Sequence, residues 1–386
     1  MQIKGNIFIS HLTSILLLLS VFTSSTDPVY ANIQSDIDTI KKKYAELIIR
    51  EHKNTYDVGE LINRQTANGS WPEINYNDQS EAGFDGKFHL DYLKELAIFY
   101  VRNPKSKLLK DIDQAIHSGL QYWINITPRA EGWWWDQIGA PLIMGELCLL
   151  FEEHLNADMI EEAVQLMYGI NGDKLYYLHV RPEKHTPATG QNLVWFSKVH
   201  LIGSLLQRDT TGMKTAFQKV GEEIRLSEGE GIKYDFSFHQ HGPQLNSGSY
   251  GLTFSLDASL FLYLASGTSF AYPAEKVDII FSYILDGQQW MTHKGNFSYN
   301  AKGRSVTREA PENTEDLIKA CNYLSSIDHI RNSEVVAFLN SLEHKKQSTN
   351  FLGNKHFWQS DLMVHQKPDY YISLRMASDR TIGSES

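Results

Sequence analysis

The densest set of side chains that could do acid–base chemistry lies in one short stretch, residues 235–251. This stretch contains two histidines, one of them His241, and it ends close to Tyr250. Its glycines and proline, at Gly242-Pro243 and Gly248, predict a loop rather than an amphipathic helix. Loops carried by a rigid scaffold are common places for reactive side chains. The alternative is a histidine-rich surface turn beside a buried, hydrogen-bonded tyrosine, and for a loop taken alone that alternative is favoured.

Two further segments carry polar groups that could bind an anion. Asn192 stands in a Thr-Gly-Gln-Asn loop that opens a predicted helix, where its ordinary role would be a helix cap. Arg304 and Arg308 are four residues apart, so they share a face in a helix or a strand. Arginine forks suit carboxylate or sulfate groups. A surface salt-bridge pair is the alternative, and it is favoured for two arginines considered in isolation.

Three adjacent tryptophans, Trp133, Trp134 and Trp135, form the fourth feature. They cannot all point inwards, so at least one is expected to be exposed as a binding platform, with a corner of the core as the alternative. Neither a GxSxG nucleophile motif nor a glycine-rich phosphate loop is found. The carboxylate pair of a glycoside hydrolase needs no fixed spacing and remains open. No CxxC or HxxxH pattern occurs, so neither a metal nor a cofactor is predicted.

Taken together, an amide, an imidazole, a phenol and two guanidinium groups suit β-elimination on a uronic acid. Removing the C5 proton builds negative charge on the C6 carboxylate, which Asn192 and His241 could neutralise by hydrogen bonding, as donors stabilise an oxyanion. Tyr250 could then take the proton, although its reference pKa of about 10 would have to be lowered by a neighbouring arginine. The same tyrosine could return the proton to the leaving O4, which leaves a 4,5-unsaturated uronate.

Composition sets limits on the class of protein. The chain has 386 residues, of which 42% are hydrophobic and 21% charged, so we expect a packed core in one large domain or two ordinary ones. A net charge of -10 argues against a general nucleic-acid-binding protein. It still permits a polyanionic sugar, because a local basic cleft can steer such a substrate.

The first residues predict export. Lys4 precedes an apolar run, residues 15–21, and Ala31 ends an acceptable cleavage site, so residues 1–31 are predicted to be a signal peptide. The run is too short to span a bilayer, and we expect a secreted or periplasmic protein without a membrane span. Cys148 and Cys321 lie far apart in apolar helical segments and are expected to be buried free thiols.

Apolar periodicity predicts an all-α domain over residues 32–350. Helices are expected in several places, among them 106–124, 191–207, 250–266, 273–290 and 333–344. Residues 55–86 are expected to be a long irregular connection, and there is little strand signal before residue 350. So many paired helices predict stacked hairpins in a toroid or solenoid. Alternation over residues 371–376 predicts a strand, so residues 351–386 are interpreted as the beginning of a truncated β-sandwich.

The motifs resemble those of polysaccharide lyase family 8, with chondroitin AC lyases as the most similar members and hyaluronan and xanthan lyases as further relatives. The segments that carry the resemblance are Thr189–Asn192, His239–Gly251, Gly303–Arg308 and Gly353–Arg380. The spacing from histidine to tyrosine, followed by Arg-x-x-x-Arg, is specific as a combination. The resemblance covers most of the predicted mature chain.

The resemblance implies an incomplete α/α toroid, followed in the family by large antiparallel β domains. It implies that Asn192 and His241 neutralise the carboxylate and that Tyr250 is general base and acid. The roles it implies for the other residues are substrate binding and tuning of the tyrosine by Arg304 and Arg308, stacking on sugar rings by Trp133 and Trp134, and alignment of the arginines and histidine by Glu385. It implies no cofactor.

Three functions follow as hypotheses. The leading one is an exported lyase, expected to be monomeric, that acts on the acidic polysaccharides chondroitin sulfate or hyaluronan. The first alternative is a catalytically inactive toroid that only binds acidic glycans, since most of the family's first β domain is absent from this sequence and we expect it to be truncated. The second alternative is a toroidal glycoside hydrolase.

Overall fold

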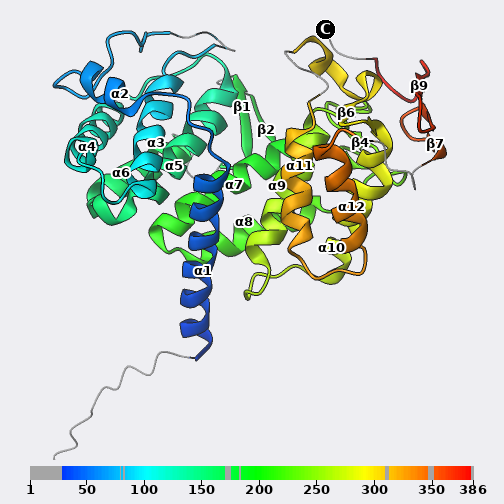
Figure 1. Cartoon of the computed structure of the whole chain (residues 1–386), viewed down its shortest axis with the longest axis horizontal. Coiled ribbons are helices and arrows are strands. Elements are labelled where there is room, and N and C mark those ends of the chain that lie inside the picture. The colour runs from blue at the N-terminus through cyan, green and yellow to red at the C-terminus, as the bar shows by residue number, and fades with distance from the viewer. Residues whose placement is uncertain are drawn as a thin grey trace, which may run out of the picture.

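Helices dominate the computed structural model, which describes residues 28–78, 80, 83–169, 175–181, 184–308, 313–346 and 352–383 (Figure 1). The α-helices are α1 (Pro28–Glu51), α2 (Val58–Arg64), α3 (Lys87–Arg102), α4 (Leu109–Ile126), α5 (Ala140–Phe151), α6 (Ala157–Tyr168), α7 (Gly190–Gln207), α8 (Thr210–Glu223), α9 (Tyr250–Ala265), α10 (Ala274–Ser282), α11 (Glu315–Ser325) and α12 (Asn332–Glu343). The strands are β1 (Tyr177–Arg181), β2 (Lys184–Pro187), β3 (Gly231–Ile232), β4 (Phe238–His239), β5 (Thr292–His293), β6 (Asn296–Phe297), β7 (Gly353–Phe357), β8 (Leu362–Gln366) and β9 (Tyr371–Arg375).

The helices form two concentric layers. Going along the chain, α3, α5, α7, α9 and α11 each pack against the next odd-numbered helix and make an inner layer. Each inner helix also packs against the even-numbered helix that follows it, from α4 to α12, and these make the outer layer. This alternation of inner and outer helices is an α/α toroid built from helical hairpins, so the predicted fold class is confirmed.

Helix α1 stands between the two ends of this incomplete ring (Figure 1). It packs against α5 and α9, and its last turn bonds to side chains of both α11 and α3. The Tyr323 hydroxyl of α11 donates to Glu51 Oε1 of α1 at 2.8 Å. His52, directly after α1, lies 3.0 Å from Glu95 Oε2 of α3, measured from its Nε2. The end of α1 therefore joins the first and last inner helices through side chains.

Two inner helices, α7 and α9, are buried on nearly all sides. Apolar residues are spread around both helices instead of forming one stripe, which is the pattern of a helix packed all round. The outer α4 shows the contrasting pattern, because its buried residues recur at three- and four-residue spacing. Since Asn192 lies in α7 and Tyr250 begins α9, the two most enclosed helices present two of the predicted site residues.

A network of charged side chains lies inside the inner layer. One member comes from α1 and one from each inner helix, and in that order the charges alternate in sign: Glu51, Lys94, Glu146, Lys198, Asp257 and Lys319. Lys94 bonds Glu146, and Lys198 Nζ lies 3.2 Å from Asp257 Oδ1. All but Asp257 line a cavity of about 370 Å³. Buried charges are tolerated only when they are paired, so this alternation allows a polar interior.

Several local expectations were wrong. Residues 55–86 contain α2, whose N-cap Asp57 accepts a hydrogen bond from the Glu60 backbone N–H. Three antiparallel hairpins, β1–β2, β3–β4 and β5–β6, precede residue 350. Their strands have two to five residues, too few for alternation to stand out. The helix expected over 273–290 is divided into α10, a π-helical turn and a 3₁₀ turn.

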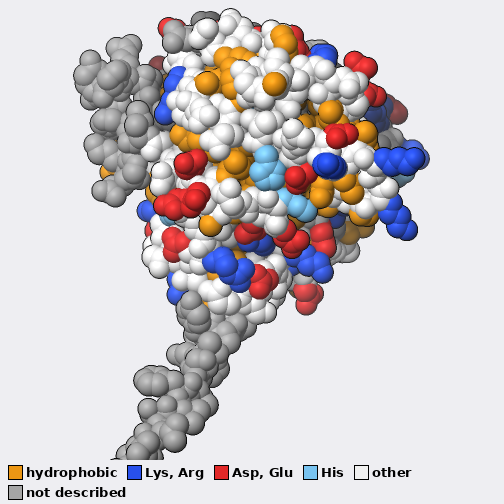
Figure 2. Space-filling model, turned by 90° about the vertical axis from the view of Figure 1, so that its left-hand side faces the viewer, with side chains coloured by type: hydrophobic (Ala, Val, Ile, Leu, Met, Phe, Trp, Pro, Cys, Tyr) orange, Lys and Arg blue, Asp and Glu red, His pale blue; other side chains and the backbone are white. Residues whose placement is uncertain are grey.

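The C-terminal sheet has the strand order β7-β8-β9 and is antiparallel throughout. Its inner face buries Phe357, Leu362 and Val364, which confirms a β segment after the helices. Cys148 and Cys321 are buried free thiols, as predicted. Most of the predicted signal peptide lies outside the described residues, among which no helix combines the length and the apolar character needed to cross a bilayer. On the face shown in Figure 2, acidic and basic side chains are mixed.

The alternating charge network generates a prediction about stability. Burial raises the pKa of Glu146, but Lys94 and Lys198 outweigh burial and hold that pKa below its ordinary value. Lys94→Met leaves the carboxylate without its nearest cation, so we expect a loss of about 3 kcal/mol in the free energy of unfolding, measured in urea. Lys42→Met is the control, because the Lys42–Glu46 pair is exposed and should contribute about 0.5 kcal/mol or less. Equal losses in the two variants would contradict this account.

Candidate active site

A cavity of about 1030 Å³ lies where the first turns of several inner helices meet. The residues that line it come from the segment before α5, the beginning of α7, the first turns of α9 and α11, and a 3₁₀ turn at Gly303–Thr307. Helix N-termini carry partial positive charge, although the first backbone N–H groups of α7 and α9 already have hydrogen-bond partners in the protein. Their convergence around one cavity favours an anionic ligand.

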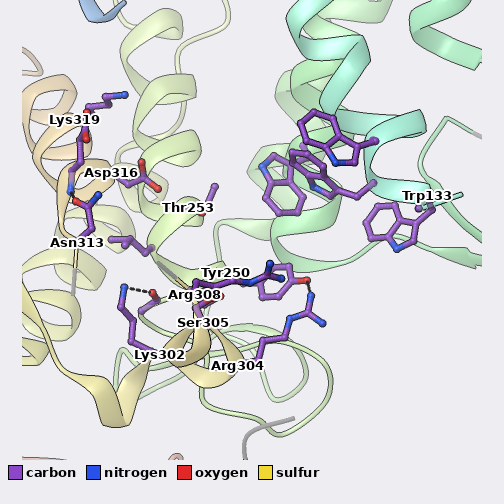
Figure 3. A pocket seen from close by; sticks show the side chains of 18 of the residues that line it. Trp133, Tyr250, Thr253, Lys302, Arg304, Ser305, Arg308, Asn313, Asp316 and Lys319 are labelled. Atoms are coloured by element: carbon purple, nitrogen blue, oxygen red, sulfur yellow. Dashed lines mark hydrogen bonds between the residues drawn. The ribbon is translucent and has the colours of Figure 1, made fainter. Parts of the chain in front are cut away.

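Tyr250 lies at the centre of the lining, between Arg304 and the aromatic residues (Figure 3). Arg304 Nη2 donates to the Tyr250 hydroxyl at 2.8 Å, and the guanidinium carbon lies 5.7 Å from the centre of the tyrosine ring. The His241 ring is 5.0 Å from the tyrosine ring, centre to centre. Only 9% of Tyr250 is exposed, yet its hydroxyl meets a cation and not apolar side chains. A cation at this distance favours the phenolate over the phenol.

The turn that carries Arg304 is held against the loop before Tyr250. Gly303 has a φ of +54°, and a Cβ there would lie 2.1 Å from Asn246 Oδ1. The buried Lys302 donates from Nζ to the Gly248 carbonyl at 2.9 Å. The hydroxyl oxygens of Ser249 and Ser305 are 2.6 Å apart. These contacts fix the position of the arginine relative to the tyrosine.

His241 is exposed and adopts a φ of +62°, in the left-handed region that few residues other than glycine enter. Such conformations cost free energy and occur most often at functional sites. His241 contacts Tyr250 but is not among the residues that line the cavity. The loop prediction for this segment is accurate at Gly242 and Pro243, whereas Phe238–His239 forms the short strand β4.

Asn192 is buried in the first turn of α7, inside the helix and not at its cap. Its Oδ1 has no hydrogen-bond partner among the described residues. A buried amide without a partner is uncommon and indicates a group that awaits a ligand or water. Asn192 does not line the cavity, but Trp195, one turn later on the same helix, does.

The aromatic wall is larger than the sequence predicted. Trp133, Trp134 and Trp135 are all half-buried and all line the cavity. Trp195 joins them, with its ring 5.7 Å from that of Trp134 and 5.9 Å from that of Tyr250. The sequence did offer one indication of Trp195: it lies three residues after Asn192, and this spacing places both residues on one face of α7.

The opposite wall is polar (Figure 3). Arg308 is exposed and lines the cavity, as do Asn313, Asp316 and Lys319 at the beginning of α11. Burial raises the pKa of the Asp316 carboxyl, and the nearby Asp257 carboxylate raises it further. None of these α11 residues was singled out in the sequence, because charged residues at a helix start have an ordinary explanation.

Glu385 lies outside the described residues. The chain just before it is placed, since the Ile382 backbone N–H donates to the Pro243 carbonyl at 3.0 Å. Gln244 Nε2 donates to the Gly383 carbonyl at 2.8 Å. The segment that leads to Glu385 therefore runs beside the His241 loop. The described residues contain no group of three or more His, Cys, Asp or Glu side chains that could hold a metal ion.

Two family models match most of the chain. Residues 28–346 match the family model "Polysaccharide lyase family 8, N terminal alpha-helical domain", and residues 352–386 match "Polysaccharide lyase family 8, super-sandwich domain". Chondroitinase-AC of Pedobacter heparinus is 26% identical over 336 residues, 84% of this chain and 46% of that protein. A hyaluronate lyase of Thermasporomyces composti is 25% identical over 185 residues, 47% of this chain and 23% of that protein.

Solved structures show the same fold. A chondroitinase AC lyase, described in complexes with oligosaccharides, matches with a TM-score of 0.81 and 22% identity over 91% of this chain and 51% of its own. A Streptomyces coelicolor chondroitin AC lyase in complex with chondroitin sulphate matches with a TM-score of 0.73 and 19% identity, over 91% of this chain and 55% of its own. The chain spans about half the length of these proteins.

The contact between Gly303 and Asn246 generates a prediction. Gly303→Ala should cost about 1 kcal/mol for a side chain in the left-handed region and about 1–3 kcal/mol more for the clash. Gly267→Ala is the matched control, because Gly267 has a φ of +76° but no atom within 4 Å of the added Cβ. Urea unfolding should therefore show the larger loss for Gly303→Ala. Equal losses of stability in the two variants would show that the turn with Arg304 does not pack closely against the loop before Tyr250.

Proposed function

The chain belongs to polysaccharide lyase family 8. We propose that it cleaves glycosaminoglycans that contain uronic acid, namely chondroitin sulfate and hyaluronan, by β-elimination. The observation that carries this proposal is the hydrogen bond from Arg304 to the Tyr250 hydroxyl, beside a cavity with one aromatic wall and one polar wall that includes basic side chains. A phenol held next to a guanidinium group is suited to give and accept a proton.

The first step is removal of the C5 proton of the uronate at the cavity. Tyr250 is the proposed base, because its hydroxyl accepts a hydrogen bond from Arg304, which stabilises the phenolate. The C5 proton is acidic enough to be removed only when the negative charge that builds on the adjacent carboxylate is stabilised. A fixed donor aimed at that developing charge lowers the barrier of the step more than it strengthens substrate binding.

Asn192 and His241 are the proposed donors to that carboxylate. His241 lies against Tyr250, so a carboxylate bound by its imidazole would be next to the base. Asn192 has a buried amide whose oxygen lacks a partner, in the first turn of α7. The orientation of that amide would set which of its two polar atoms faces the ligand. The positive end of α9 adds to the stabilisation of an anion.

The second step is departure of O4 from C4 as the C4–C5 double bond forms. The electron pair left by the C5 proton becomes the new bond, and the C4–O4 pair leaves with the oxygen. Tyr250 then returns the proton to O4, which gives a free hydroxyl on one fragment and a 4,5-unsaturated uronate on the other. One residue serves both steps: the phenolate becomes a phenol when it takes the C5 proton, and it is a phenolate again after it gives that proton to O4.

The remaining lining residues are proposed to hold the polymer. Trp133 and Trp134 present half-buried rings on which sugar faces can stack, while Arg308 offers an exposed guanidinium to carboxylate or sulfate groups. Glu385 is proposed to align the arginines and His241, and the chain that leads to it runs along that loop.

Export of the protein is also a proposal, and it rests on the charged and apolar pattern of residues 1–31. N-terminal sequencing of protein recovered from the medium or periplasm should begin at Asn32. Recovery of the protein only in the cytoplasm, with the first residues intact, would contradict export.

The proposed activity is tested by incubating the chain with chondroitin and following the ultraviolet absorbance of a conjugated uronate. We expect that absorbance to rise together with new chain ends. Retention on a chondroitin column without absorbance would mean binding alone, and new reducing ends without absorbance would mean hydrolysis. Either result would contradict the proposal.

The same assay tests the role of Tyr250. Tyr250→Phe removes the only proton that the ring can exchange, so kcat should fall about 10³-fold, while affinity for the polymer stays within a few-fold. The matched control is Tyr263→Phe, at the other end of α9 and outside the cavity lining, which should keep wild-type turnover. Normal turnover in Tyr250→Phe would remove this residue from the mechanism.

A further inference from the structure

A second set of side chains connects the three segments that carry Asn192, His241 and Tyr250. Each member of this set is either adjacent in sequence to one of these three residues or on the same face of the same helix. The members of the set are Gln191, Gln240 and Asp257, all at most 1% exposed. They do not line the cavity, and the proposed reaction does not use them. Most buried polar groups in a core have hydrogen-bond partners, so each contact of these three side chains is informative.

The first connection joins α9 to α7. Asp257 lies seven residues after Tyr250, which is two turns along the same face of α9. Its Oδ2 accepts a hydrogen bond from Gln191 Nε2 at 2.7 Å, and its Oδ1 lies 3.2 Å from Lys198 Nζ. Gln191 and Lys198 are themselves seven residues apart on α7, so one carboxylate is bound to two successive places on one face of that helix.

The second connection joins α7 to the loop with His241. The Gln191 backbone N–H donates to Gln240 Oε1 at 3.0 Å, and Gln240 directly precedes His241. Gly190 is required for this approach, because it has a φ of +55° and a Cβ there would lie 2.2 Å from Gln240 Oε1. The Gln240 carbonyl in turn accepts from Asn246 Nδ2 at 2.8 Å.

We propose that Asp257, Gln191 and Gln240 are positioning residues that together set the distances among Tyr250, Asn192 and His241. The continuous path runs from the Tyr250 helix through Asp257 and Gln191 to the backbone beside Asn192, and through Gln240 to the backbone beside His241. This inference rests on the proposed function, which assigns the three positioned side chains to one sugar ring. Displacement of a reacting group by about 1 Å can cost about 100-fold in rate, so such a path matters for turnover.

A purely structural role would have a different signature. Removing a hydrogen bond that only supports the fold lowers stability and leaves the folded molecules equally active. Removing one that positions reacting groups lowers kcat in the folded molecules, while KM changes little because the cavity walls remain. The split between kcat and KM, measured well below the melting temperature, therefore separates the two roles.

The experiment uses Gln191→Met and Gln240→Met, which keep side-chain volume and remove the amide. We expect kcat on chondroitin to fall about 10- to 100-fold with KM within threefold. The double variant should lose little more than either single variant, because both interrupt one path. Gln65→Met is the matched control: Gln65 Nε2 joins two segments by donating to the Ala115 carbonyl at 2.9 Å, outside the cavity lining. It should lose stability and keep wild-type kcat.

A second readout does not depend on turnover. Hydrogen–deuterium exchange of Gln240→Met, which loses the acceptor of the Gln191 backbone N–H, should increase around residue 191 as well as in the peptide 238–250, as followed by mass spectrometry, whereas Gln65→Met should leave both unchanged. Exchange confined to the peptide 238–250, or wild-type kcat in both glutamine variants, would overturn the positioning role. If the wild-type chain makes no unsaturated product but exchange still increases around residue 191, the connection stands and the proposed lyase function fails.

Discussion

The arrangement of this protein depends on how charge is accommodated inside a ring of helices. Asp257 is 1% exposed, and an isolated carboxylate in such a place would be strongly unfavourable. Lys198 compensates it, and Glu146 and Lys94 extend the alternation to the next two inner helices. Each pair joins neighbouring helices of the inner layer. The same ion pairs therefore neutralise the buried charges and hold these helices in register. Breaking one pair leaves a buried charge behind, which costs far more than the pair itself contributes.

This interior has consequences at the mouth of the ring. The inner helices whose side chains meet around Asp257 also present their first turns to the larger cavity, where Tyr250, Trp195 and Lys319 lie. Positive potential there comes from arginine side chains, a buried lysine amine and the N-terminal ends of helices, and it is partly opposed by the carboxyl groups of Glu131, Glu315 and Asp316. A protein with a net charge of -10 can therefore still offer a local site for an acidic polymer.

Much of this could be predicted from the sequence, for physical reasons. Long helices can be predicted because their apolar residues recur periodically. Tyr250 and His241 were noticed because so many polar side chains in one loop have no structural explanation. The short helix α2 was missed because it spans only seven residues, contains Gly59 and is followed by Gly69 and Pro72. Trp195 was overlooked because it lies in an apolar helix pattern, where a tryptophan needs no special explanation.

The contacts that organise the site were out of reach of sequence patterns. Gln191 and Asp257 are 66 residues apart, and nothing in either neighbourhood indicates the other. Nothing in the sequence around Lys302 indicates that this lysine is buried and bonded to the Gly248 carbonyl. Such pairs depend on which helices become neighbours, and that follows from the packing of the whole ring.

The central claim is that an amide, an imidazole and a phenol converge on one uronate. The most direct measurement is a crystal structure of the Tyr250→Phe variant with a chondroitin oligosaccharide bound. The account predicts one uronate with its carboxylate about 3 Å from the side chains of both Asn192 and His241, and with C5 and O4 facing the ring of residue 250. An oligosaccharide bound in the cavity with every uronate carboxylate remote from Asn192 and His241, or with C5 turned away from residue 250, would contradict it.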